Sequence, residues 1–198
     1  MLKNEIAIPK DVEARIENGR LYAKGSKGEV SKEFKHPNVK MGIDNGKVVL
    51  TSDIERKKTK AIMGTWTVLI TNMFLGVEKG WKSELKLVYS HFPVKMKVEE
   101  GKLLIENFLG ERRPREAPIP EDVKVDVEKN TIFVTGADKE RVGQTAAHIE
   151  EVTKVKGYDR RVFQDGCFIT KKPYVIEVEN EGERGTARGQ EENKEEKA

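Results

Sequence analysis

An internal repeat constrains this chain more than any other feature of its sequence. Residues 39–52 align without a gap on residues 123–136, and residues 12–25 align on residues 94–107. The two offsets, 84 and 82 residues, are nearly equal. Because two blocks match in the same order, chance similarity between alternating strands is a poor explanation. We therefore expect two tandem copies of one structural unit.

Each repeated block has the pattern of a β-hairpin. Apolar residues alternate on both sides of Asn18-Gly19 and of Asn45-Gly46. Asn-Gly between alternating strands favours a tight hairpin, because both turn residues must adopt a positive φ. We expect each copy to begin with two hairpins.

One helix is expected after the hairpins of each copy. Apolar residues follow helical spacing over 58–77, with Gly80 after the end, and over 138–155, with Asp138 as N-cap and Gly157 after the end. A strand is expected after each helix. Its residues are 85–89 in the first copy, and 167–169 with 174–178 in the second.

These elements predict an α+β fold of two tandem duplicated domains, each an antiparallel sheet with one helix packed on one face. We place the first domain at 1–91 and the second at 92–179, with the joint near Ser90–Pro93. Residues 180–198 lack apolar periodicity and are rich in Gly and Glu, which predicts a disordered acidic tail.

The charge balance limits the possible partners. The chain has 37 Lys and Arg against 34 Asp and Glu, a net charge of +3. This excludes a histone-like polycation but leaves nucleic-acid binding open, because local distribution matters more than the sum. Residues 1–91 carry 17 basic and 11 acidic groups, so the first half is more basic than the whole.

Localisation is predicted from what the sequence lacks. Cys167 is the only cysteine, which excludes an intramolecular disulfide and a CxxC zinc motif. No run of about 18 apolar residues is present, and the first residues lack the apolar core of a signal peptide. We expect a cytoplasmic protein without a membrane partner.

No catalytic residue, metal site or cofactor is predicted. The sequence contains no GxSxG, P-loop or GxGxxG motif. His148 and Glu151 could form half a metal site, but a pair on a helix surface is the favoured interpretation. Cys167, in an apolar strand, is interpreted as a buried structural cysteine, and Trp66 as a core residue.

Three basic clusters remain, and a charge run is usually a solvated face. They are Arg56–Lys60, Arg112–Arg115 and residues 154–172. The third mixes cations with Gly157, Tyr158 and Gln164 over a stretch without clear periodicity. Glycine lets the backbone approach a phosphate, arginine binds phosphate with two hydrogen bonds, and a tyrosine ring can stack on a base. RNA contact and a solvated loop both remain open for this cluster.

Several segments together resemble one known family. They are His91-Phe92-Pro93-Val94, Asn107–Glu111, Gly64-Thr65 with Asn72-Met73, Val142–Ala147 and Tyr158–Gly166. Over about residues 5–178 the chain is similar to the universal large-subunit ribosomal protein six family in its archaeal form, whose eukaryotic counterpart is numbered nine. The resemblance implies two α+β domains produced by duplication and a non-catalytic protein that binds ribosomal RNA.

The resemblance also implies where RNA binds, chiefly the C-terminal portion of the second domain. The implied RNA-binding residues are Lys154, Lys156, Gly157, Tyr158, Arg160, Arg161, Gln164, Asp165, Gly166, Lys171 and Lys172, with Arg112, Arg113 and Arg115 as further contacts. The implied partners are large-subunit rRNA near the sarcin–ricin loop, neighbouring ribosomal proteins at the stalk base, and translational GTPases that dock nearby.

Two other classes of function remain as alternatives. A nucleic-acid-processing enzyme would need His148, Glu151 and Asp165 to converge in space. A protein-interaction module would act through exposed sheet edges and would bind with weak salt dependence.

Overall fold

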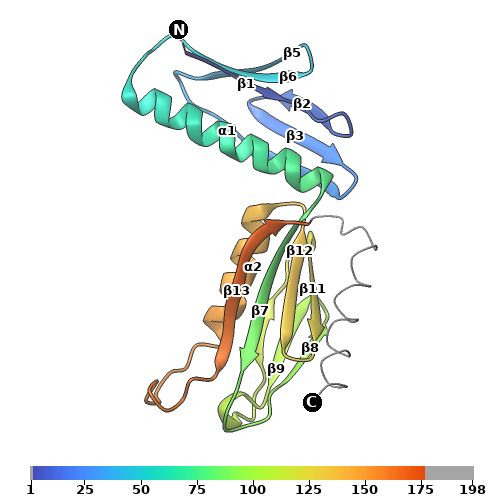
Figure 1. Cartoon of the computed structure of the whole chain (residues 1–198), viewed down its shortest axis with the longest axis vertical. Helices are drawn as coiled ribbons and strands as arrows, with labels where there is room; N and C mark the ends of the chain where they lie inside the picture. Colours follow the sequence, from blue (N-terminus) through green and yellow to red (C-terminus); the bar gives the residue numbers. More distant parts are fainter. Residues whose placement is uncertain (1, 177–198) are drawn as a thin grey trace, which may run out of the picture.

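The computed structural model describes residues 2–176, so the predicted tail at 180–198 lies outside the described residues. Two α+β domains follow one another along the long axis of the molecule (Figure 1). Each contains antiparallel sheets and one long helix, which confirms the predicted fold class. The single sheet expected in each domain is divided into two smaller sheets.

The first domain packs two three-stranded sheets against one helix, and their strand orders are β1-β6-β5 and β2-β3-β4. Its core includes Leu21, Val48, Leu50 and Ile70, which are fully buried. The elements are β1 (Leu2–Ala7), β2 (Glu13–Glu17), β3 (Arg20–Gly25), β4 (Gly28–Glu33), β5 (Lys40–Asp44), β6 (Lys47–Ser52) and α1 (Lys57–Glu78).

The second domain has a three-stranded sheet, β10-β9-β8, and a four-stranded sheet, β11-β12-β7-β13. Its core includes Leu85, Ile105, Ile132 and Ile149, all fully buried. The elements are β7 (Trp81–Val88), β8 (Lys95–Glu99), β9 (Lys102–Glu106), η1 (Phe108–Gly110), β10 (Arg115–Pro118), β11 (Val123–Glu128), β12 (Thr131–Gly136), α2 (Lys139–Val152) and β13 (Gly166–Val175).

The repeated blocks form equivalent hairpins. The block at 12–25 forms β2 and β3, and its counterpart at 94–107 forms β8 and β9. Asn18 and Gly19 have φ values of 50° and 78°, and Glu100 and Gly101 have 48° and 72°. Both turn residues of each hairpin therefore have positive φ, as a type I′ turn requires.

Helix α2 begins as predicted. The side chain of Asp138 accepts a hydrogen bond of 2.9 Å from the backbone N–H of Glu140, which caps the helix. Helix α1 is long and apolar enough by length and composition to cross a membrane. It is the core helix of the first domain, since Met63, Trp66 and Ile70 are buried against the sheets.

Strand β7 belongs to a different domain from the one that the sequence predicts. The sequence predicts a strand at 85–89 in the first repeat and a domain that ends at residue 91. Strand β7 instead pairs with β12 and β13, and Trp81, Leu85 and Leu87 belong to the core of the second domain. Alternation along the chain identifies a strand, but only long-range hydrogen bonding decides its sheet.

Close backbone contacts join the two domains where α1 ends. A Cβ built on Gly76 would lie 2.0 Å from the carbonyl oxygen of Ala137 and 2.7 Å from Nε1 of Trp81. The Trp81 Nε1–H donates a hydrogen bond of 3.2 Å to the carbonyl of Asn72, and Lys139 Nζ lies 4.4 Å from the centre of the same indole. Position 76 has no room for a side chain, so the junction is tightly packed.

We predict that Gly76→Ala lowers the free energy of unfolding by about 1–3 kcal/mol, because the added methyl group displaces the backbone at Ala137. Urea unfolding followed by circular dichroism measures the change. The matched control is Gly64→Ala in the same helix, where nothing lies within 4 Å of the built Cβ. Gly64→Ala is expected to stabilise by up to about 1 kcal/mol. Equal effects of the two substitutions would contradict the tight junction.

Candidate nucleic-acid interface

Three segments far apart in the sequence meet at the end of the second domain that is remote from the first (Figure 1). They are residues 89–94 between β7 and β8, residues 107–114 between β9 and β10, and residues 153–165 between α2 and β13. We call this region the distal end. It contains the basic cluster at Arg112–Arg115 and most of the cluster at 154–172. The lysines of the latter cluster that belong to β13 lie outside it.

Buried and exposed side chains alternate at the start of the loop at 153–165. Thr153 and Val155 are buried, whereas Lys154 and Lys156 are exposed. Gly157 follows with a φ of 78°, and nothing lies within 4 Å of a Cβ built there. The inward pair anchors the loop while the lysines and the glycine backbone face solvent. The other exposed residues of the predicted set at this end are Tyr158, Arg160, Arg161, Gln164, Arg112 and Arg113.

Three aromatic rings pack against one another in tilted pairs along the same loop. The Tyr158 ring centroid lies 4.8 Å from that of Phe163, and the Phe163 centroid lies 4.6 Å from that of His91. Tyr158 remains 50% exposed at the end of this stack. Nothing local in the sequence shows that residues 91 and 163 meet, because the contact joins segments that are far apart along the chain.

Asp165 lies inside the protein, although it was predicted to contact RNA. The residue is only 4% exposed, and its Oδ1 accepts a hydrogen bond of 2.6 Å from the backbone N–H of Ser90. Its Oδ2 lies 3.6 Å from Nδ1 of His91 and has no hydrogen-bond partner within residues 2–176. The carboxylate therefore ties residues 89–94 to the loop at 153–165. Gly166 is also buried.

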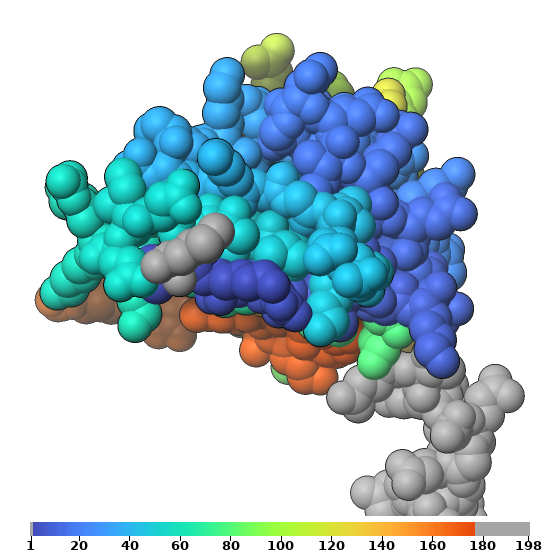
Figure 2. Space-filling model, turned by 90° about the horizontal axis from the view of Figure 1, so that it is seen from above, coloured from blue at the N-terminus to red at the C-terminus, as the bar shows by residue number. Residues whose placement is uncertain are grey.

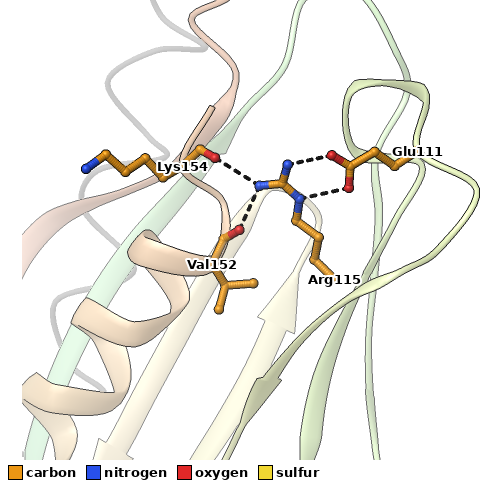
Figure 3. A network of polar contacts seen from close by, with 4 residues as sticks. All are labelled: Glu111, Arg115, Val152 and Lys154. Carbon is orange, nitrogen blue, oxygen red and sulfur yellow. Dashed lines mark hydrogen bonds and ion pairs between the residues drawn. The ribbon is translucent and has the colours of Figure 1, made fainter. Parts of the chain in front are cut away.

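Arg115 has an internal role (Figure 3). Its guanidinium forms two hydrogen bonds with the Glu111 carboxylate, at 2.9 and 2.6 Å. It also donates to the carbonyls of Val152 and Lys154, at 2.8 and 3.0 Å. The group lies 4.3 Å from the centre of the Phe108 ring. Because these donors are engaged within the protein, Arg115 positions the loops rather than presenting a cation to RNA.

The same contacts affect the charge of Glu111. Its hydrogen bond from Arg115 lowers the pKa of the Glu111 carboxyl below its usual value, against the opposing effect of burial. The carboxylate consequently stays ionised to a lower pH than an ordinary glutamate, and it holds the guanidinium that fixes the start of the basic loop.

A groove separates the end of α2 from the basic loop. Its volume is about 730 Å³. The lining includes Lys154, Arg160 and Gln164 from the loop, Glu150 from α2 and Cys167 from β13. The lining contains two basic residues, Lys154 and Arg160, and three acidic residues, Glu150, Glu151 and Asp165. The groove is therefore mixed in charge, in contrast to the exposed cations of the loop beside it.

Lys171 and Lys172 lie apart from this end. They are carried by β13, the edge strand of the four-stranded sheet, which leads back towards the junction (Figure 1). Lys171 Nζ lies 3.2 Å from the Glu84 carboxylate. The structure therefore does not bring these two lysines together with the loop residues.

The constellation that the alternative of a nucleic-acid-processing enzyme would need is not formed by residues 2–176. Within residues 2–176, no group of three or more His, Cys, Asp and Glu lies together in a way that could hold a metal ion. Asp165 is buried between Ser90 and His91, whereas His148 and Glu151 lie on α2.

The fold and this end of it define a duplicated α+β protein with a cationic surface that carries an exposed aromatic ring. Two segments of the chain, residues 8–80 and 92–166, match the sequence profile of the family described as Ribosomal protein L6. The chain belongs to this family, which is structural and not enzymatic. The predicted resemblance is confirmed.

Archaeal relatives are similar over almost their whole length, and each is named large ribosomal subunit protein uL6. The protein of Natronomonas pharaonis is 41% identical over 172 residues, which cover 87% of this chain and 97% of the relative. That of Methanothrix thermoacetophila is 44% identical over 165 residues, with coverages of 83% and 94%. That of Methanobrevibacter smithii is 44% identical over 171 residues, with coverages of 86% and 96%.

We predict that Arg115→Lys destabilises the second domain by about 1–3 kcal/mol, because lysine cannot bond Glu111 and the two carbonyls at once. Urea unfolding measures the change. The control is Arg113→Ala in the same loop, where the side chain is exposed and the expected change is within about 0.5 kcal/mol. A loss at Arg113 as large as that at Arg115 would contradict the assigned role.

The loss in Arg115→Lys should also depend on pH. The folded-state pKa of Glu111 is depressed, so the stability that this carboxylate contributes is present above its ordinary pKa of 4.5 and is lost as pH falls through the lower pKa of the folded state. Unfolding measured from pH 7 down to pH 3 should therefore show a smaller difference between the variant and the parent at low pH, while the part due to the Val152 and Lys154 carbonyls remains. A constant difference over this range would contradict the pairing.

The Cys167 thiol is predicted to be inert in the folded protein. The residue is 1% exposed, and burial raises the pKa of its thiol to about 11. Relative to a pKa of 9.0, this shift leaves about a hundredfold less thiolate near neutral pH. Labelling with a chromogenic disulfide reagent should be slow in buffer and rapid in urea. Rapid labelling of the native protein would show that the strand is open.

Proposed function

We propose that this chain binds large-subunit ribosomal RNA through the distal end of its second domain, as a structural constituent of the large ribosomal subunit in the cytoplasm. The observation that carries the proposal is the grouping of exposed cations on two neighbouring loops beside the exposed ring of Tyr158. Membership of the ribosomal protein L6 family supports the ribosomal setting.

Electrostatic attraction supplies most of the affinity in this proposal. Lys154, Lys156, Arg160 and Arg161 approach phosphates and release the counterions condensed on the RNA, so binding weakens steeply as salt increases. The arginines can bind phosphate with paired hydrogen bonds. Gly157 leaves the backbone accessible, which allows a phosphate to approach the loop closely.

Shape and stacking supply selectivity. Proteins recognise folded RNA through its shape, its 2′-hydroxyl groups and its unstacked bases. The Tyr158 ring, supported from behind by Phe163, offers a surface on which an unstacked base can lie. Gln164 provides amide donors and an acceptor for a sugar or base edge beside it.

Two internal contacts prepare the surface before RNA arrives. Arg115 fixes the start of the basic loop and Asp165 fixes its end. A loop held in its binding geometry loses less conformational entropy on association, so affinity increases without an additional contact. We assign these two residues to positioning and the exposed loop residues to contact.

The family resemblance suggests the location of the bound RNA. We place it near the sarcin–ricin loop and the stalk base, with ribosomal proteins as neighbours and translational GTPases docking nearby. The first domain lacks a counterpart of the Tyr158–Gly166 stretch and would brace a separate feature or face a protein.

The test is binding to an rRNA fragment that contains the sarcin–ricin region, compared with an unrelated duplex, over a salt series. Arg160→Ala/Arg161→Ala should weaken binding to the fragment and reduce the slope of log K against log salt by about 1–2. Fluorescence anisotropy measures both quantities.

The matched control is Arg15→Ala/Arg20→Ala, which removes two exposed arginines from the first domain. It should leave the preference for the fragment unchanged. Equal weak binding of the parent protein to both RNAs, unaffected by Arg160→Ala/Arg161→Ala, would reject the distal end as the RNA site and favour a protein-interaction module.

A further inference from the structure

Strand β1 has an open edge where its counterpart in the second repeat has none. In the second domain β7 lies between β12 and β13, hydrogen-bonded on both sides. In the first domain β1 pairs with β6 and, within residues 2–176, with no other strand. Figure 2 shows this N-terminal segment, in dark blue, at the surface of the first domain.

The two strands are equivalent in sequence and in register. Residues 2–8, LKNEIAI, align on residues 81–87, WKSELKL, with Lys3 matching Lys82 and Glu5 matching Glu84. Leu2 lies opposite Ser52 and Trp81 opposite Gly136, positions that the repeat also makes equivalent. This third block of the duplication has an offset of 79 residues, which differs from the 84 and 82 of the other two.

The alternating backbone shows which groups of β1 face the open edge. The amide of Ile8 donates to Gly46, at 3.1 Å, as that of Leu87 donates to Asn130, at 2.7 Å. These amides point towards β6 and β12, so every second residue before them points the other way. The outward residues of β1 are consequently Lys3, Glu5 and Ala7.

The second repeat shows what occupies such an edge. The backbone carbonyl of Glu84, the counterpart of Glu5, accepts a hydrogen bond of 3.0 Å from the Thr170 hydroxyl of β13. Its carboxylate accepts hydrogen bonds from Lys171 Nζ, at 3.2 Å, and from the Tyr174 hydroxyl. An antiparallel strand carrying a lysine and a tyrosine therefore satisfies this edge.

Glu5 has the same carboxylate acceptor as Glu84, but within residues 2–176 no strand equivalent to β13 lies beside it. Its carboxylate instead accepts from Lys47 on β6, at 2.9 Å, and lies 2.7 Å from Lys3 Nζ, with 40% of its side chain exposed. Hydrogen bonds from Lys3 and Lys47 lower the pKa of Glu5 to about 2, so it is an anion at neutral pH. The chain passes from α1 directly into β7, so within residues 2–176 the first repeat has no strand equivalent to β13.

We propose that the open edge of β1 binds an extended segment of a neighbouring protein, which adds to the sheet as an antiparallel strand with a lysine or tyrosine side chain on Glu5. The row of outward amides and carbonyls spaced for a β-ladder favours a polypeptide over RNA. This inference concerns the first domain, and it stands or falls independently of RNA contact at the distal end.

The first test uses a peptide with the sequence of β13, residues 166–175, carrying Cys167→Ser. Added to the isotope-labelled full chain, it should shift the amide resonances of Lys3, Glu5 and Ala7 and slow their hydrogen exchange. Glu5→Gln should weaken peptide binding about two- to fivefold, the range expected for an exposed ion pair. Glu33→Gln, which alters an exposed carboxylate on β4 in the other sheet of the first domain, is the matched control.

Resonance changes confined to β7 would mean that the peptide only replaces β13. No resonance change at β1, up to the solubility limit of the peptide, would mean that the edge does not accept a strand. Either result overturns the proposal.

The second test uses purified large subunits that contain the chain with a photoreactive phenylalanine analogue at Ala7. Cross-linking to one mapped protein segment, reduced by Glu5→Lys, supports the proposal. Cross-linking to rRNA alone, or to no neighbour, overturns it.

Discussion

Hydrogen bonding along both edges of β7 is the constraint on which the rest of the molecule depends. The strand leaves α1 through Gly80, and Trp81 then packs both in the domain junction and in the second core. Pairing with β12 and β13 makes β7 central to the four-stranded sheet. Its far end leads into residues 89–94, where Ser90 meets Asp165. Junction, sheet and distal end are therefore positioned by one strand, and disturbing it would affect all three.

The distal end separates residues that position the loops from residues available to a partner. The family resemblance implies RNA contact at both Arg115 and Asp165. Their hydrogen bonds are used within the protein, where they hold together loops that have little secondary structure of their own. The exposed cations nearby can then face a partner in a defined arrangement, which lowers the entropic cost of binding.

The duplicated halves share a fold but differ where partners would bind. The second repeat adds the loop at 153–165 and β13 after its helix, whereas the first proceeds directly from α1 into β7. The second repeat thereby obtains a basic loop and a covered sheet edge. The first retains an open edge and an anionic Glu5. Divergence after duplication has thus placed different surfaces on equivalent frameworks.

The sequence by itself determined the duplication, the hairpins with their positive-φ turns, both helices and the location of the basic loops. These features depend on neighbours within a few residues, so periodicity and turn chemistry are sufficient to predict them. Tertiary structure alone decided that β7 belongs to the second sheet, that His91 stacks on Phe163, and that Arg115 and Asp165 face inward. Each of these outcomes joins residues far apart along the chain. Their energies come from hydrogen bonds and burial that exist only after the chain has folded, so no local pattern records them.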